Sequence, residues 1–248
     1  MIYLTGLLLL LLWLVCGRHG WVIFGSLAGS FITLMLLVML IADEFNPVVV
    51  GVILAVVLVY WAIYPNTPNP QVRRTALVCT LMTLLLLLAL AVVFIYGTFS
   101  YGFASEDTEE IEQFVTSIGI SFPQIQVIVV LLSSLGAVAE ASIAISAGMW
   151  ELVAYQPQIS AQRLWAAGLA LSRKNLITAF NTLLFGFFGS YLTLGLWFLQ
   201  LHYAPVKIIN NVIVSTAVVE LVLAFGGILL VMLLVNGYII WQRRHQTR

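Results

Sequence analysis

Hydrophobic positions along the 248-residue chain gather into long runs that short polar stretches separate. A run of roughly 18 or more apolar residues can cross the ~30 Å hydrocarbon core of a bilayer as a helix. The period-2 alternation of an outer-membrane barrel is absent. The pattern therefore predicts an all-α protein, a polytopic bundle of transmembrane helices.

We expect seven spans, of which the first is short. They cover about Ile2–Val15, Trp21–Ala42, Pro47–Tyr64, Thr75–Gly97, a stretch within Ile118–Ala147, Leu176–Leu199, and a stretch within Ile208–Trp241. Interfacial helices are expected before spans six and seven. The first is an amphipathic elbow that Pro157 interrupts and Ser160 caps. The second is Val206–Val219, because the last apolar segment is too long to cross the bilayer once.

The basic residues sort to one side of the seven predicted spans. Nine of the ten lie there: Arg18, Arg73, Arg74, Arg163, Arg173, Lys174, Arg243, Arg244 and Arg248. Only Lys207 falls on the other side. Lysine and arginine concentrate in cytoplasmic loops. The sequence thus predicts an outside N-terminus and a cytoplasmic C-terminus, in the cell membrane.

Composition supports this class and excludes others. Hydrophobic residues make up 62% of the chain and charged residues 8%, with a mean hydropathy of +1.09, whereas a soluble domain carries about 25% charged residues. The chain has no P-loop, no hydrolase or metalloprotease motif and no basic surface for nucleic acid. Cys16 and Cys79 are expected to be small hydrophobes. We expect no enzyme activity, no cofactor and no metal site.

The two parts of the chain differ in polarity. Residues 1–113 hold four Leu/Val-rich spans and an acidic outer loop, Ser100–Phe114, with five acids. This loop is expected to be a solvated cap, although it could bind cations or a basic peptide. Residues 114–248 hold three spans that carry polar residues inside the membrane. Any activity is expected in this second part.

Span six has one small, polar face and one bulky face. Residues advance about 100° each on a helix, which aligns Asn175, Thr178, Thr182, Gly186, Gly189 and Thr193. Ile177, Phe180, Leu184, Phe187 and Tyr191 fall on the other side. We expect the small face to pack against protein and the aromatic face to meet lipid. Arg173 and Lys174 mark the cytoplasmic boundary.

Spans five and seven carry similar stripes, each with one glutamate. Ser133, Gly136, Glu140 and Ala144 share one face of span five, and Thr216, Glu220 and Ala224 share one face of span seven. Three such stripes predict three helices that turn their polar edges toward each other around a polar path.

A carboxylate in hydrocarbon costs at least ~2.5 kcal/mol unless it is paired or neutralised. Such a group suits proton or cation coupling. The candidate transport residues are Glu140, Asn175, Asn181, Thr182 and Glu220. In the alternative interpretation, the two glutamates lie near the ends of their spans and Asn181 makes only interhelical hydrogen bonds.

Three blocks resemble the YibE/F family of bacterial multi-pass membrane proteins. They are GAVAEASIAISAGMWE (Gly136–Glu151), LSRKNLITAFNTLLFGFFG (Leu171–Gly189), and the final Asn210, Glu220 and Gly226–Gly227. The resemblance covers roughly Gln124–Ile240. Glu140 stands where the family has an aspartate, and Lys174 replaces an acid.

The resemblance implies a membrane complex rather than a chemical activity. Family members resemble one half of a pair encoded together, so a longer YibE-type paralogous membrane protein is an expected partner, alongside a second copy of the chain and membrane lipids. Two functions stay open. One is a transporter or exporter subunit whose carboxylates couple protons or cations, and the other is a structural or regulatory subunit that transports nothing.

Overall fold

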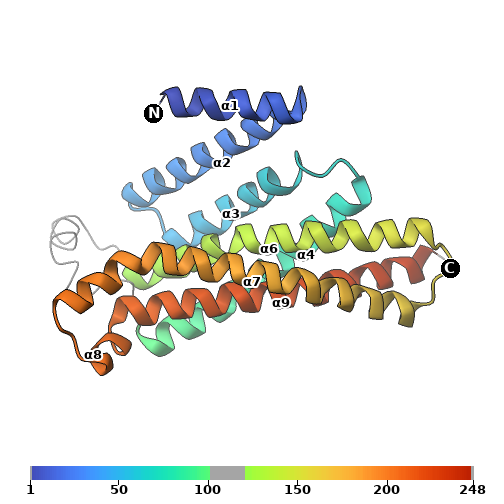
Figure 1. The fold of residues 1–248 in the computed structure, drawn as a ribbon. Helices are drawn as coiled ribbons and strands as arrows, with labels where there is room; N and C mark the ends of the chain where they lie inside the picture. The colour runs from blue at the N-terminus through green and yellow to red at the C-terminus, as the bar shows by residue number, and fades with distance from the viewer. Residues whose placement is uncertain (1, 101–120, 247–248) are drawn as a thin grey trace.

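The computed structural model describes residues 2–100 and 121–246, and these are helical almost throughout (Figure 1). The eight helices in these ranges are α1 (Ile2–Cys16), α2 (His19–Ala42), α3 (Pro47–Ile63), α4 (Pro70–Thr98), α6 (Phe122–Tyr155), α7 (Ala161–Gln200), α8 (Pro205–Ile209) and α9 (Val212–Gln246). The acids of the expected outer loop, Glu106–Glu112, lie outside the described residues, as does Arg248.

Five of the helices are long and apolar enough to cross a membrane: α2, α4, α6, α7 and α9. This confirms a multi-pass membrane protein with a helical fold. Helices α1 and α3 are apolar but shorter, with 15 and 17 residues. They occupy the positions of the first and third expected spans, and a complete crossing by either one stays a prediction.

Asparagine and proline set the starts of α3 and α4. The side-chain oxygen of Asn46 accepts hydrogen bonds from the backbone N–H of Val48 and Val49, at 3.0 and 3.2 Å. Asn69 caps α4 in the same way, and a proline follows each cap. Proline suits the first helical position because its missing N–H would have no partner there. Helix α4 therefore begins at Pro70, earlier than the expected Thr75.

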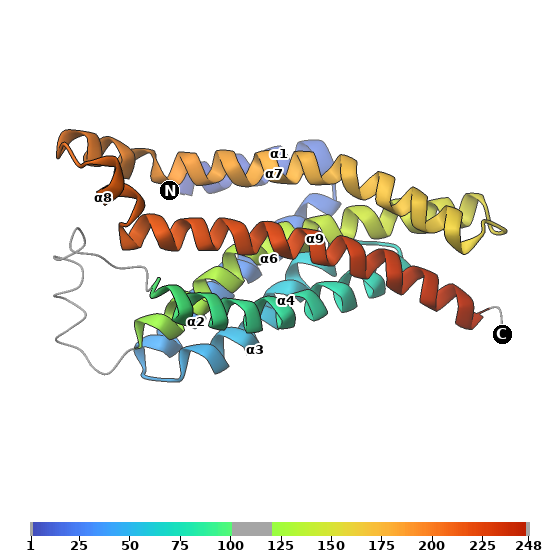
Figure 2. The same ribbon diagram turned by 90° about the horizontal axis from the view of Figure 1, so that it is seen from below.

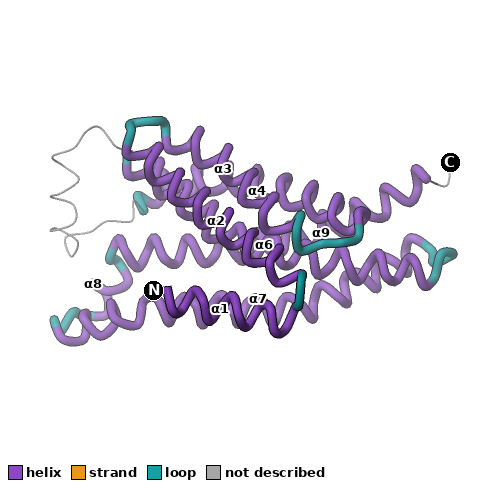
Figure 3. Tube along the Cα trace, turned by 90° about the horizontal axis from the view of Figure 1, so that it is seen from above, coloured by secondary structure: helices purple, strands orange, loops and turns teal. Residues whose placement is uncertain are grey.

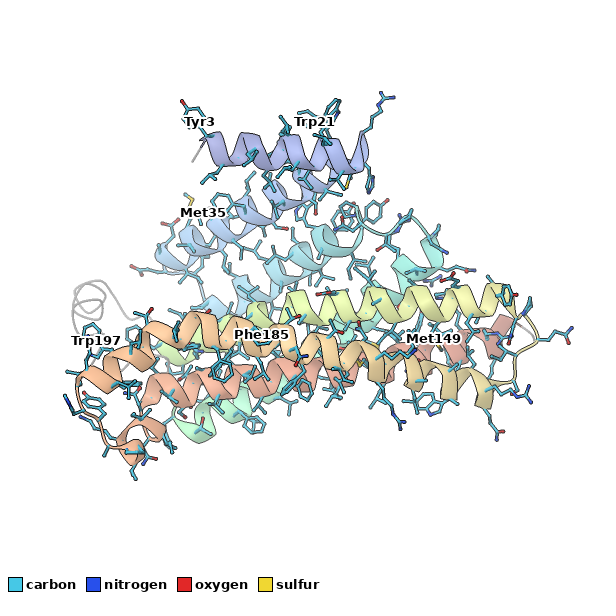
Figure 4. All side chains as sticks on the ribbon, in the orientation of Figure 1. Tyr3, Trp21, Met35, Met149, Phe185 and Trp197 are labelled. Carbon is cyan, nitrogen blue, oxygen red and sulfur yellow. The ribbon has the colours of Figure 1, made fainter. Side chains whose placement is uncertain are left out.

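The helices form a layered bundle with α6 at its centre. Helices α6, α7 and α9 run side by side in both Figure 1 and Figure 2, and α6 packs most extensively against α4 and α9. Helices α1, α2 and α3 step away from this layer to one side in Figure 1, and in the view from above in Figure 3 α1 overlaps α7. Tyr3 and Trp21 project from the outer side of the α1–α2 pair (Figure 4), with 93% and 57% of their surface exposed.

Small and hydroxylated residues hold α4 against α6. The indole N–H of Trp150 donates to the hydroxyl of Thr75 at 3.0 Å, and the Ser142 hydroxyl donates to the carbonyl of Ala76 at 3.2 Å. All four residues are buried. Small side chains let membrane helices approach closely, and interhelical hydrogen bonds then satisfy their polar groups.

The expected elbow before span six turns at Pro157 as predicted, but no separate helix follows it, and its seating at the membrane surface stays a prediction. Helix α6 continues to Tyr155 and α7 begins at Ala161, with only a short turn between them. Ser160 caps α7 as expected, because its hydroxyl accepts from the N–H of Arg163 at 3.4 Å. The amphipathic stretch is the first part of α7, whose 40 residues reach ~60 Å.

A short helix does precede span seven, but the break lies earlier than expected. Helix α8 ends at Ile209, and the side chain of Asn211 accepts from the N–H of Ile213 at 2.9 Å to start α9. Asparagine favours such caps. The stretch expected to be interfacial up to Val219 is therefore mostly part of α9, and Glu220 lies inside one continuous helix.

Candidate functional site

Glu220 lines a groove of about 330 Å³ between α6, α7 and α9. Its side chain is half-buried. Hydroxyl groups from two other helices line the same groove, Ser133 of α6 and Thr182, Ser190 and Tyr191 of α7. A carboxylate with several hydroxyls around it can accept a proton or hold a small cation.

The groove lies within the apolar length of the helices. Glu220 is eight residues inside α9, ~12 Å from the start of that helix at Val212. Thr182 is 18 residues before the end of α7 at Gln200, ~27 Å along its axis. Glu220 thus lies inside its apolar helix rather than at the water-exposed end, where a carboxylate would carry little cost.

A second, apolar section adjoins this groove on the side toward α8. It has a volume of about 450 Å³ and is lined almost wholly by aromatic and aliphatic side chains of α7, with Ile208, Val214 and Ala217 from α8 and α9. Phe187, Tyr191 and Ala217 line both sections. The two sections share these wall residues and are together called the α7–α9 groove here, with a polar and an apolar part.

Glu140 lies in a different groove, of about 450 Å³, between α2, α3 and α6. Ser26, Ser30 and Asn66 are the other polar residues that line it. Ser26 donates its hydroxyl to the carbonyl of Trp61 at 2.6 Å, and Asn66 donates to the carbonyl of Ala62 at 2.9 Å. Glu140 itself is exposed.

The expectation that the polar stripes of spans five and seven turn toward each other is therefore wrong for their two glutamates. The face of α6 that carries Glu140 points outward, because the opposite face, with Ser134, Val138 and Ser142, is buried in the core. Ser133 and Glu140 are seven residues apart and share the exposed face. Ser133 lines the α7–α9 groove and Gly136 and Glu140 line the other, so one face of α6 connects both grooves.

Helix α7 is turned opposite to the expectation. Thr178, Thr182 and Gly186 on its small face are exposed, whereas the bulky face is half-buried against the bundle at Phe180, Leu184, Phe187 and Tyr191 and exposed only at Ile177. Phe180 packs on Phe225 of α9 with ring centroids 4.5 Å apart, and Leu183 packs against the core. Bulky side chains bury more apolar area, which stabilises this orientation through dispersion contacts.

The structure thus brings together only two of the predicted site residues, Thr182 and Glu220. Asn181 is exposed on α7 outside this groove, and Asn175 is half-buried nearer the start of that helix. Arg173 and Lys174 are exposed.

A buried polar contact that the sequence did not reveal joins α7 and α9. Asn236 is fully buried and its amide donates to the hydroxyl of Ser172 at 3.2 Å. Its side-chain oxygen has no hydrogen-bond partner among the described residues. Gly168 faces this oxygen, and a Cβ there would clash with it. The sequence signal for this contact is Asn236 itself, a single asparagine in the apolar run before Gly237.

The acids, histidines and cysteines do not form a metal site in the part of the chain that the structure describes. No group of three or more of these residues lies close enough to hold a metal ion there.

Comparison with known proteins adds a family and no function. No curated protein and no solved structure matches the chain. The family profile described as YibE/F-like protein matches residues 4–242. This match extends well beyond the expected Gln124–Ile240 and covers nearly the whole chain, and the protein therefore belongs to the YibE/F-like family.

Proposed function

We propose that the chain is an integral membrane subunit of a transporter or exporter, in which Glu220 and Glu140 bind a proton or a cation. One observation carries this proposal: a half-buried carboxylate lies inside an apolar helix and lines a groove with hydroxyl groups from two neighbouring helices. Carboxylates inside membrane spans are costly and usually mark ion or substrate pathways.

The exposed face of α6 supplies the proposed route between the two carboxylates. Ser133 contributes to the groove of Glu220, and Gly136 and Glu140 contribute to the second groove. Glycine and serine leave room along this face. We infer from the positive-inside bias that the end with Arg163 and Arg243 is cytoplasmic, in the cell membrane. Glu220 then lies in the outer half of the route.

Flux into proteoliposomes tests the proposal. The purified chain is reconstituted with a pH-sensitive dye inside, and proton and monovalent-cation fluxes are driven by a potassium diffusion potential. The variants Glu220→Gln and Glu140→Gln remove a charge with little change in volume and are expected to abolish the protein-dependent flux. Glu151→Gln is the matched control, because Glu151 is exposed near the end of α6. Unchanged flux in Glu220→Gln would refute the carboxylate mechanism.

A second candidate is a subunit that supports a complex without transporting anything. The exposed Asn181 of α7 favours it, because an amide in lipid gains from a hydrogen-bond partner on another helix. The partner would be a second copy of the chain or a longer YibE-type paralogous protein. Asn181→Leu separates the two functions: loss of co-purifying partners with normal flux supports this candidate.

A further inference from the structure

The α7–α9 groove has a feature that a site for protons alone does not need. Its polar part, with Glu220, continues into an apolar part that is the larger of the two. Each part falls within the roughly 300–1,000 Å³ of small-molecule sites. A single negative charge beside a long apolar wall is complementary to a molecule with one positive end and one apolar end.

The charges of the groove restrict the ligand further. None of the described residues that line either part is basic, and Glu220 is the one acid among them. A phosphate group would therefore find no cationic partner in this lining. This chemistry disfavours phospholipids and favours a free amphiphile with a cationic head.

Aromatic side chains support the same ligand class. Phe187 and Tyr191 lie where the two parts meet, with ring centroids 5.1 Å apart. Aromatic faces attract ammonium groups, with quaternary ammonium as the best-known case. These two rings can flank the junction between the cationic head and the tail.

We propose that the α7–α9 groove binds an amphipathic organic cation, an amine or quaternary ammonium with its head beside Glu220 and its alkyl or aryl tail in the apolar part. This inference rests on the proposed transport function and names its substrate class. The ligand would enter from the lipid or from the side of the membrane that carries Lys207.

Two substitutions separate the head site from the tail site. Glu220→Gln removes the charge that faces the head. Gly195→Leu fills the apolar part, and the fold tolerates it because a Cβ at Gly195 meets nothing within 4 Å. Glu151→Gln again serves as the matched control, since Glu151 lies outside the groove.

The experiment measures saturable binding of radiolabelled hexyltrimethylammonium and dodecyltrimethylammonium to the full chain in nanodiscs, with empty nanodiscs subtracted. We expect Glu220→Gln to weaken both ligands about tenfold or more, because it removes the charge partner of the head. Gly195→Leu should weaken the dodecyl compound about tenfold and the hexyl compound much less. Glu151→Gln should bind both as the unmodified protein does.

Three results would overturn the proposal. One is dodecyl binding that Glu220→Gln leaves unchanged, and another is an equal effect of Gly195→Leu on both ligands. The third is competition by phosphatidylethanolamine added to phosphatidylglycerol nanodiscs, which would identify a lipid head group as the occupant. If Glu220→Gln abolishes small-cation flux but the unmodified protein binds neither amphiphile, the result supports the transport function and excludes only this ligand class.

Discussion

Glu140 and Glu220 lie in two separate grooves, and the exposed face of α6 extends from one groove to the other. This relationship changes the mechanism that the stripes alone suggest. A central polar path would place both carboxylates around one ion. Two grooves along one helix face instead place them at successive positions, and in the proposed transport function a cation or proton passes between them along Ser133 and Gly136.

The contact between Gly168 and Asn236 predicts a sharp size limit at position 168. Gly168→Ala would place a methyl group against the side-chain oxygen of Asn236. Overpacking of this kind costs about 1–3 kcal/mol, so the thermal midpoint in detergent should fall. Gly186→Ala is the control, because its Cβ meets nothing within 4 Å. Equal midpoints for the two variants would show that α7 and α9 are not in close contact at Gly168.

The hydrogen bond between Trp150 and Thr75 predicts an energetic coupling between α4 and α6. Trp150→Phe leaves the buried hydroxyl of Thr75 without its donor, and Thr75→Val leaves the buried indole N–H of Trp150 without its acceptor. Each variant should therefore destabilise the protein by about 1–3 kcal/mol. The double variant should lose less than the sum, by about 0.5–1.5 kcal/mol. Unfolding in mixed micelles with SDS measures the cycle, and strict additivity would contradict the bond.

The sequence predicts the helices better than it predicts their orientation. Hydrophobic length locates the spans, and side-chain chemistry locates their ends, as Ser160 and Pro47 show. Periodicity defines two faces of α7, but it does not decide which face meets protein. That choice depends on the surface of α9, where Phe225 receives Phe180. For the same reason, Glu140 was placed on the correct face of α6 but toward the wrong neighbours.

The buried polar contacts were harder to predict than the groove. Glu220 stands out because acids are rare in membrane spans, and Thr182 stands out because it belongs to the small, polar stripe of span six; both line the α7–α9 groove. Thr75 and Ser172 do not stand out, since hydroxyl groups are common in membrane helices. Their role depends on Trp150 and Asn236, which lie more than 60 positions away in the chain.

The hydrogen bonds of Arg243 predict that this residue keeps the turn between α6 and α7 in a fixed conformation. Its guanidinium donates to the carbonyl of Ile159 at 3.1 Å and also to the carbonyl of Pro157. Arg243→Ala removes both bonds, so a protease that cleaves within residues 156–160 should act several times faster. Arg243→Lys retains the charge but not the forked geometry, and should give an intermediate rate. Equal cleavage of all three proteins would exclude this role for Arg243.

The reactivity of the two cysteines tests both the packing of the helices and the orientation of the protein in the membrane. Cys79 is fully buried in the core, whereas Cys16 is partly exposed at the end of α1. A maleimide should therefore label Cys16 and spare Cys79. Because we infer that Arg18 lies on the cytoplasmic side, a membrane-impermeant maleimide should label Cys16 in cells only after permeabilisation. Labelling of Cys16 in intact cells would reverse the proposed orientation, and Cys16→Ser provides the background signal.

We expect the groove beside Glu220 to admit water and cations, whereas the exposed side chain of Phe185 on α7 meets lipid. Reaction with a cationic, water-soluble methanethiosulfonate tests it in the intact protein, with Cys16→Ser and Cys79→Ala as the background. Thr182→Cys lies in the groove and Phe185→Cys lies outside it at a site that is 75% exposed. Rapid modification at position 182, slowed by Glu220→Gln, with little reaction at 185, is the predicted result. Equal protection of both positions would show that the groove is dry and would contradict the account.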